Sequence, residues 1–201
     1  MNNLSREGKV LIFNSMIGSM LYSLWCPVIT KALYENLAQW YFYIESGAYC
    51  IGGALITWLW TRKATAEFVK RHFVGIYILL ITSNIICGFG GYIIGGTRGF
   101  YFYAMLSILT NCILQTNLNN LFIDIKAQAF QAFRAEYDRT HMLMGYVSVI
   151  LGSGLGLISM LRFDNPFHSM LALTVVDVLV LSLELVVAKK LMKSIVKQNN
   201  K

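Results

Sequence analysis

Amide and hydroxyl side chains crowd one apolar stretch near the middle of the 201-residue chain. Asn111, Gln115 and Asn119 are spaced by four, so in a helix they form a single stripe. A second stripe, on another face of the same helix, consists of Thr116, Asn117, Asn120 and Asp124. Such side chains are costly in hydrocarbon unless they face protein or water. The pattern indicates either the lining of a water-filled cavity or hydrogen bonds between helices.

A matching polar stripe lies near the start of the chain. It consists of Asn14, Ser15, Gly18, Ser19, Tyr22 and Ser23. Two helices that each carry a polar stripe are natural walls of one polar space. We therefore predict a solute-binding site formed by Asn14, Tyr22, Asn111, Gln115 and Asn119.

Three carboxyl groups also fall inside apolar stretches, namely Glu45, Asp177 and Glu184. Asp177 lies about ten residues from one end of its stretch, which is about 15 Å in a helix. Ionisable residues at such depth mark ion or proton pathways, so all three are candidates for proton coupling. A protonated Asp177 that is hydrogen-bonded to a neighbouring helix is the alternative.

The elements that carry these residues follow from composition. The chain is 56% hydrophobic and 13% charged, whereas soluble domains contain about 25% charged residues. The apolar residues occur in runs of about twenty, the length at which a helix crosses a bilayer. We predict an all-α integral membrane protein with one domain of six transmembrane helices, over residues 10–30, 40–60, 73–95, 100–122, 142–161 and 167–188.

Basic residues orient this bundle. Fourteen of the 17 Lys and Arg residues fall on the side of the two ends, the 2–3 loop and the 4–5 loop. The other side receives Lys31, Arg98 and Arg162. Because cytoplasmic loops are enriched in Lys and Arg, both termini are predicted in the cytoplasm, at the cell or inner membrane. The net charge of +7 then reflects topology and lipid contact rather than nucleic-acid binding.

Cysteine and histidine offer little chemistry. The four cysteines lie in different predicted spans, and no Cys-x-x-Cys pair or Cys/His cluster occurs. We therefore expect no metal, no cofactor and no enzymatic activity, with an intramembrane peptidase as a minor alternative. Small residues at Ser148, Gly152 and Gly156 predict a close helix crossing, either within the chain or at a moving or subunit interface.

The segment from Ile125 to His141 is predicted to form a cytoplasmic extension of the fourth helix, followed by a turn. Arg134, Asp138 and Arg139 within it are candidates for a cytoplasmic gate built from ion pairs.

The six spans, the basic 2–3 loop, and the stretch NNLFIDIKAQAFQAFRAEYDRTHMLMGYVSVILGSGLGLIS (119–159) resemble one half of a major facilitator superfamily transporter. The 2–3 loop keeps only basic residues of that family's signature, and the fifth span lacks the Gly-Pro pair of its antiporters. The resemblance implies that spans 1 and 4 line a central cavity and that span 6 is a peripheral support. It also implies a second half, since a full transporter has two.

We therefore expect a half-sized secondary transporter that works as a homodimer, or with a second membrane subunit, and moves a small polar or amphipathic solute. The alternative is a non-transporting membrane subunit: a substrate-binding component of a larger importer, or a regulator or immunity-type protein. The vitamin-binding components of energy-coupling-factor transporters are similar in size and span number.

Overall fold

The computed structural model describes residues 5–131, 134–160 and 165–199. Arg162 and Lys201, which entered the charge count above, lie outside these residues. The described part of the chain is helical nearly throughout and contains no strand. Its elements are α1 (Arg6–Asn36), α2 (Gln39–Trp60), α3 (Lys63–Ile94), α4 (Gly96–Leu109), the π-helix η1 (Thr110–Gln115), α5 (Thr116–Ala129), α6 (Arg134–Met160) and α7 (Pro166–Asn199).

Three of these helices are long and apolar enough to cross a membrane. They are α1, α3 and the Pro166–Ile195 part of α7. The all-helical fold is therefore confirmed, and these helices fit a protein associated with a membrane.

Most helices run beyond the apolar stretches seen in the sequence. α3 begins at Lys63, within the predicted basic loop, and an i, i+4 pair joins Lys63 Nζ to Glu67 Oε1 at 3.8 Å. The predicted extension of the fourth helix ends at Ala129, and the rest of that segment from Arg134 onward belongs to α6. Polar flanks with good helix propensity thus continue the helices that the apolar runs begin.

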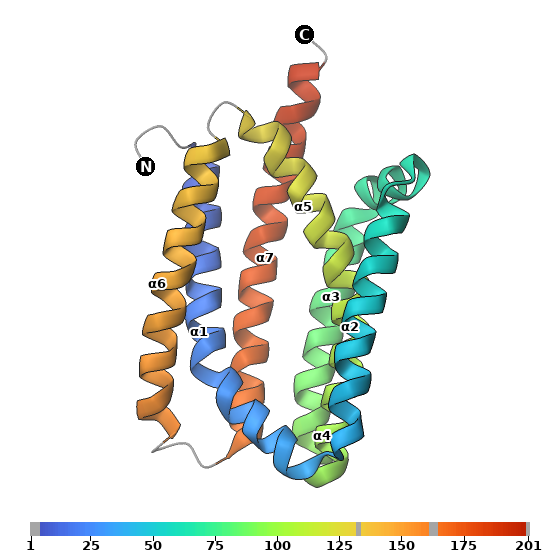
Figure 1. Ribbon diagram of the computed structural model, residues 1–201. Helices are drawn as coiled ribbons and strands as arrows, with labels where there is room; N and C mark the ends of the chain where they lie inside the picture. The colour runs from blue at the N-terminus through green and yellow to red at the C-terminus, as the bar shows by residue number, and fades with distance from the viewer. Residues whose placement is uncertain (1–4, 132–133, 161–164, 200–201) are drawn as a thin grey trace.

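The α4, η1 and α5 segments form one continuous helix, because Thr110 and Thr116 at the junctions keep right-handed helical dihedral angles. This helix starts at a turn in which Gly95 and Gly96 have positive φ values of 65° and 53°, a conformation that favours glycine. In contrast, α1 contains Pro27, and its last turns run in a different direction from the rest (Figure 1). The bend carries the end of α1 toward α2 and α4.

The helices run alternately up and down, so the start of α1 and the end of α7 lie at the same end of the bundle (Figure 1). α1 packs against α6 and α7, whereas α3 packs against α4 and α7. α2 packs mainly against η1 and α5. α7 thus lies between the α1–α6 pair and the remaining helices.

Small residues allow two close crossings. A Cβ added at Gly152 of α6 would collide with the Met20 carbonyl oxygen of α1, and one at Gly156 would lie 3.1 Å from the Leu24 oxygen. A Cβ added at Gly88 of α3 would collide with Thr174 of α7. The small-residue stripe of α6 therefore lies at a crossing within the chain.

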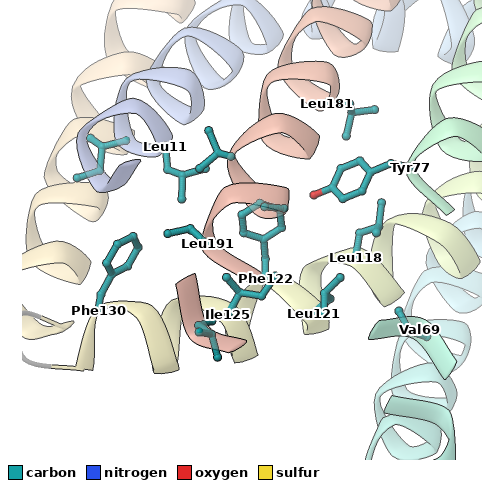
Figure 2. Packing of buried hydrophobic residues seen from close by; sticks show 14 of the residues in the cluster. Leu11, Val69, Tyr77, Leu118, Leu121, Phe122, Ile125, Phe130, Leu181 and Leu191 are labelled. Atoms are coloured by element: carbon teal, nitrogen blue, oxygen red, sulfur yellow. The ribbon is translucent and has the colours of Figure 1, made fainter. Parts of the chain in front are cut away.

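Two apolar clusters hold the ends of the bundle. The first, at the end where α1 begins, joins Leu11, Leu121, Ile125, Phe130 and Leu191 from four regions of the chain (Figure 2). The second, at the opposite end, is built from residues of α1, α2, α4, η1 and α7 and the short α1–α2 connection, and includes Ile29, Tyr41, Phe100 and Met170. The middle of the bundle, between these clusters, contains the polar residues.

Candidate functional site

A cavity of about 610 Å³ lies among the central parts of α1, α7 and the continuous α4–η1–α5 helix, with side chains from α2 and α3 completing its wall. This volume is within the range of small-molecule sites, about 300–1,000 Å³. Its polar and ionisable lining residues include Tyr22, Glu45, Tyr49, Asn84, Tyr103, Ser107, Asn111, Gln115, Thr116, Asn119, Thr174, Asp177 and Glu184.

The structure brings four of the five predicted binding residues into this lining. Tyr22 comes from α1, and the amides of Asn111, Gln115 and Asn119 come from η1 and α5. Asn14 has a different place: it is 6% exposed, and its Nδ2 donates to the Val180 carbonyl oxygen at 3.1 Å. Asn14 therefore ties α1 to α7 and does not line the cavity.

Hydrogen bonds separate the roles of the two stripes on the fourth helix. In the cavity stripe, Asn111 Nδ2 donates to the Ser107 carbonyl oxygen at 2.9 Å, and Gln115 Nε2 donates to Asn119 Oδ1 at 3.1 Å. Both bonds stay within the helix itself. This stripe lines the cavity, and Asn111 also interacts there with the Tyr49 hydroxyl of α2.

The second stripe supplies contacts between helices. Asn120 Nδ2 donates to Thr57 Oγ1 of α2 at 3.5 Å, and Asp124 Oδ2 lies 2.9 Å from Lys70 Nζ of α3. Each member of the Lys70–Asp124 pair is about one third exposed. Within the second stripe, Asn120 and Asp124 thus make contacts between helices, whereas Thr116 lines the cavity.

The π-helical turn lies at the centre of the cavity wall. It spans Thr110–Gln115, and the Thr116 hydroxyl donates to the Asn111 carbonyl oxygen five residues earlier, at 3.2 Å. A π turn contains one more residue than an α turn, so it shifts the following residues around the helix axis. Gln115 and Thr116 both line the cavity as a result.

The three predicted coupling residues, Glu45, Asp177 and Glu184, share this cavity. The resemblance implied a peripheral sixth span, yet α7 contributes Asp177 and Glu184 to the wall. None of the three carboxyl groups takes part in an ion pair or hydrogen bond with another described residue. They are thus cavity groups without a hydrogen-bond or ion-pair partner in the part of the chain that the structure describes, although Lys126 acts on Glu184 from a longer distance.

The predicted gate residues lie elsewhere. Arg134 Nε and Asp138 Oδ2 are 3.7 Å apart along α6, and both side chains are 58% exposed. Arg139 is also exposed. The Arg134–Asp138 pair lies within one helix, whereas Lys70 and Asp124 join two helices at the same end of the bundle. Because Lys70 and Asp124 are far apart in the sequence, the sequence analysis did not predict that they pair.

Several lining residues were missed by the sequence analysis. Asn84, an amide within the apolar α3, gave the clearest signal, by the same argument that identified Asn111. Tyr103 gave a weaker signal, since it lies near the start of the predicted span 100–122, where aromatic residues usually anchor a helix at the interface. Tyr49 lies in the middle of the predicted span 40–60, and its residue type alone does not indicate a cavity role. Their inward direction depends on how the helices pack.

A second cavity of about 340 Å³ lies next to the first, toward the end where α1 begins, and shares Asn119 and Glu184 with it. Lys126 and His141 line this space, and His141 Nε2 makes a hydrogen bond of 2.9 Å with Ser15 Oγ. Burial lowers the pKa of the His141 imidazole, Lys126 lowers it further, and Asp138 opposes the change.

This lowered pKa predicts a pH dependence of stability. The unfolded chain binds the His141 proton more readily than the folded one, so stability falls as the pH drops below the ordinary imidazole pKa of about 6.5. We expect the melting temperature of the wild type to fall more between pH 7.5 and pH 5.5 than that of His141→Gln. Equal losses in both proteins would contradict this assignment.

Within the described residues, no group of three or more His, Cys, Asp or Glu side chains is placed to hold a metal ion. No protein-family model, curated protein or solved structure matches the chain.

Proposed function

We propose that the chain is one half of a secondary membrane transporter, which pairs with a second copy or a partner subunit and moves a small polar or amphipathic solute. The observation that carries this proposal is the cavity of about 610 Å³ walled by amides, hydroxyls and carboxyl groups within an otherwise apolar bundle. Polar groups at such positions are costly and usually mark a solute or ion pathway.

The proposed membrane topology has six crossings, with both termini in the cytoplasm. The end of the bundle where α1 begins also contains the α2–α3 and α5–α6 connections (Figure 1). Arg62, Lys63 and Arg134 lie at these connections, whereas Arg98 lies at the opposite end. This separation of basic residues along the bundle axis supports the orientation.

Helix packing supports a transporter-like architecture. If α4–η1–α5 is counted as the fourth of six rods, the first rod packs against the fifth and sixth, and the fourth packs against the second and third. The third and sixth also pack against each other. These contacts of rods 1–3 thus have counterparts in rods 4–6, as in internal repeats of transporters, although the fourth rod also packs against the sixth through α5 and α7. This pattern fits the proposed likeness to half of a major facilitator superfamily protein.

The test is a ligand screen followed by a flux measurement. Purified protein is heated with a library of small polar and amphipathic solutes, and those that raise the melting temperature are assayed for uptake into proteoliposomes. We expect saturable uptake above that of protein-free liposomes. Absence of any stabilising solute would contradict the proposal.

A non-transporting binding subunit is the second candidate, because a single chain already forms the walls of the cavity. Native mass measurement in mild detergent separates the two candidates. A stable dimer or an obligate complex supports the half-transporter. An isolated monomer that binds solute without flux supports the binding subunit.

The topology gives a further prediction. In a variant without its four native cysteines, single cysteines at Asn36, Gly96 and Asn165 should react with an impermeant reagent from outside the cell. Cysteines at Thr65 and Gln131 should react only after the membrane is opened. Labelling of the Thr65 position from outside would contradict six crossings.

A further inference from the structure

The charges around the main cavity are of one sign. Its lining includes the carboxyl groups of Glu45, Asp177 and Glu184, which come from two helices, and no Lys, Arg or His among the described residues that line it. Burying a carboxylate without a counter-charge is strongly unfavourable. The cavity therefore has a deficit of positive charge that a guest could supply.

The three carboxyl groups differ in their surroundings. Glu184 lies at the boundary with the smaller cavity, where Lys126 also lines the wall and interacts with it electrostatically. Asp177 lies farther from that boundary, seven residues earlier on α7, and no basic side chain of the described residues acts on it. Asp177 and Glu45 are thus the two cavity carboxyl groups that no basic side chain of the described residues compensates, and of the two Asp177 lies near two of the cavity tyrosines and Glu45 near one.

Aromatic rings accompany Asp177. Tyr22 of α1 and Tyr103 of α4 are within electrostatic range of its carboxyl group, and Tyr49 of α2 is in the same range of Tyr22. All three tyrosines line the cavity. Aromatic faces attract cations through their quadrupoles, and clusters of such rings recognise quaternary ammonium groups.

We propose that the cavity binds an organic cation, an amine or quaternary ammonium compound, with its charged group at Asp177 among Tyr22, Tyr49 and Tyr103. This inference rests on the proposed function and names the substrate class of that site. The amides of Asn111 and Gln115 then orient the uncharged part of the solute through hydrogen bonds. A cation satisfies the charge deficit, whereas an anion of the same size meets three carboxyl groups and no basic residue among the described lining residues.

The test uses benzyltrimethylammonium and choline as probes on the purified full-length protein in a maltoside detergent, with affinity measured by calorimetry. Two comparison compounds are 3,3-dimethylbutan-1-ol, the uncharged isostere of choline, and the anion benzenesulfonate. We expect both cations to bind more tightly than their comparison compounds. Asp177→Asn should weaken cation binding by about tenfold or more and leave the weak binding of the neutral isostere unchanged.

Two further variants complete the design. Glu45→Gln removes a cavity carboxylate from α2 and should also weaken cation binding, so the inference remains testable if Asp177→Asn fails to fold. Glu67→Gln removes an exposed carboxylate on α3, 62% exposed and paired with Lys63, and should leave the affinity within twofold.

The outcomes separate this inference from the proposed function. Equal cation affinity in the wild type, Asp177→Asn and Glu45→Gln overturns the inference. If a neutral or anionic solute binds and is transported while the cations do not bind, the substrate class is wrong and the proposed function stands. If no solute of any charge binds, both are overturned.

Discussion

Replacing Gly152 with valine is expected to disrupt the packing of α6 on α1. The Cβ of any larger residue at this position meets the Met20 carbonyl oxygen and lies 2.9 Å from Ser23 Cβ. A backbone oxygen cannot rotate away, so the two helices must separate along their longest contact. Overpacking of this kind costs about 1–3 kcal/mol. We expect a marked loss of folded protein and a lower melting temperature.

The matched control lies two residues along the same helix. A Cβ added at Gly154 meets nothing within 4 Å, so Gly154→Val should leave the yield and melting temperature close to those of the wild type. Both substitutions change helix propensity equally. A similar response at the two positions would show that α6 does not cross α1 at Gly152.

The second large effect is expected on solute binding. Asn111→Ala and Gln115→Ala each remove an amide from the cavity wall, and each should weaken binding of a solute found in the screen by about threefold to tenfold. Asn117→Ala is the control, because Asn117 lies on the same helix but does not line the cavity. It should bind the solute as the wild type does.

This comparison isolates binding from folding. The Asn117 amide donates to the Ile113 carbonyl oxygen at 2.6 Å, just as the cavity amides bond within their own helix. Gln115→Ala and Asn117→Ala therefore lose a local hydrogen bond of a similar kind, and their melting temperatures should be similar, whereas Asn111→Ala also loses its interaction with Tyr49 of α2. If Asn111→Ala and Gln115→Ala lower stability and spare affinity, these amides serve the fold and the site assignment is wrong.

The helices and much of the cavity wall could be predicted because their signals are local. Apolar runs of about twenty residues locate the helical rods, and the four-residue spacing of Asn111, Gln115 and Asn119 places them on one face. For Asn14, the sequence pattern could not distinguish a side chain that lines a cavity from one that bonds to a neighbouring helix. Whether an amide faces a cavity or the Val180 carbonyl oxygen depends on the neighbouring helix, about which spacing carries no information.

Other features depend on tertiary packing in the same way. The resemblance argued against a cavity role for Asp177, because the sixth span of the family is peripheral. In this chain α7 packs against both α1 and α3, and it contributes Asp177 to the wall between them. The π turn that brings Gln115 and Thr116 to the same cavity is a rare element, and the regular spacing of an α-helix does not predict it.

The most direct test of the account is an electron cryomicroscopy structure of the protein in lipid nanodiscs, saturated with a solute that stabilises it. The account predicts ligand density between α1 and the α4–η1–α5 helix, in contact with the Asn111 and Gln115 amides, and a second copy or subunit beside the chain. A ligand bound elsewhere, with the space beside Asn111 closed by side chains, would contradict the account.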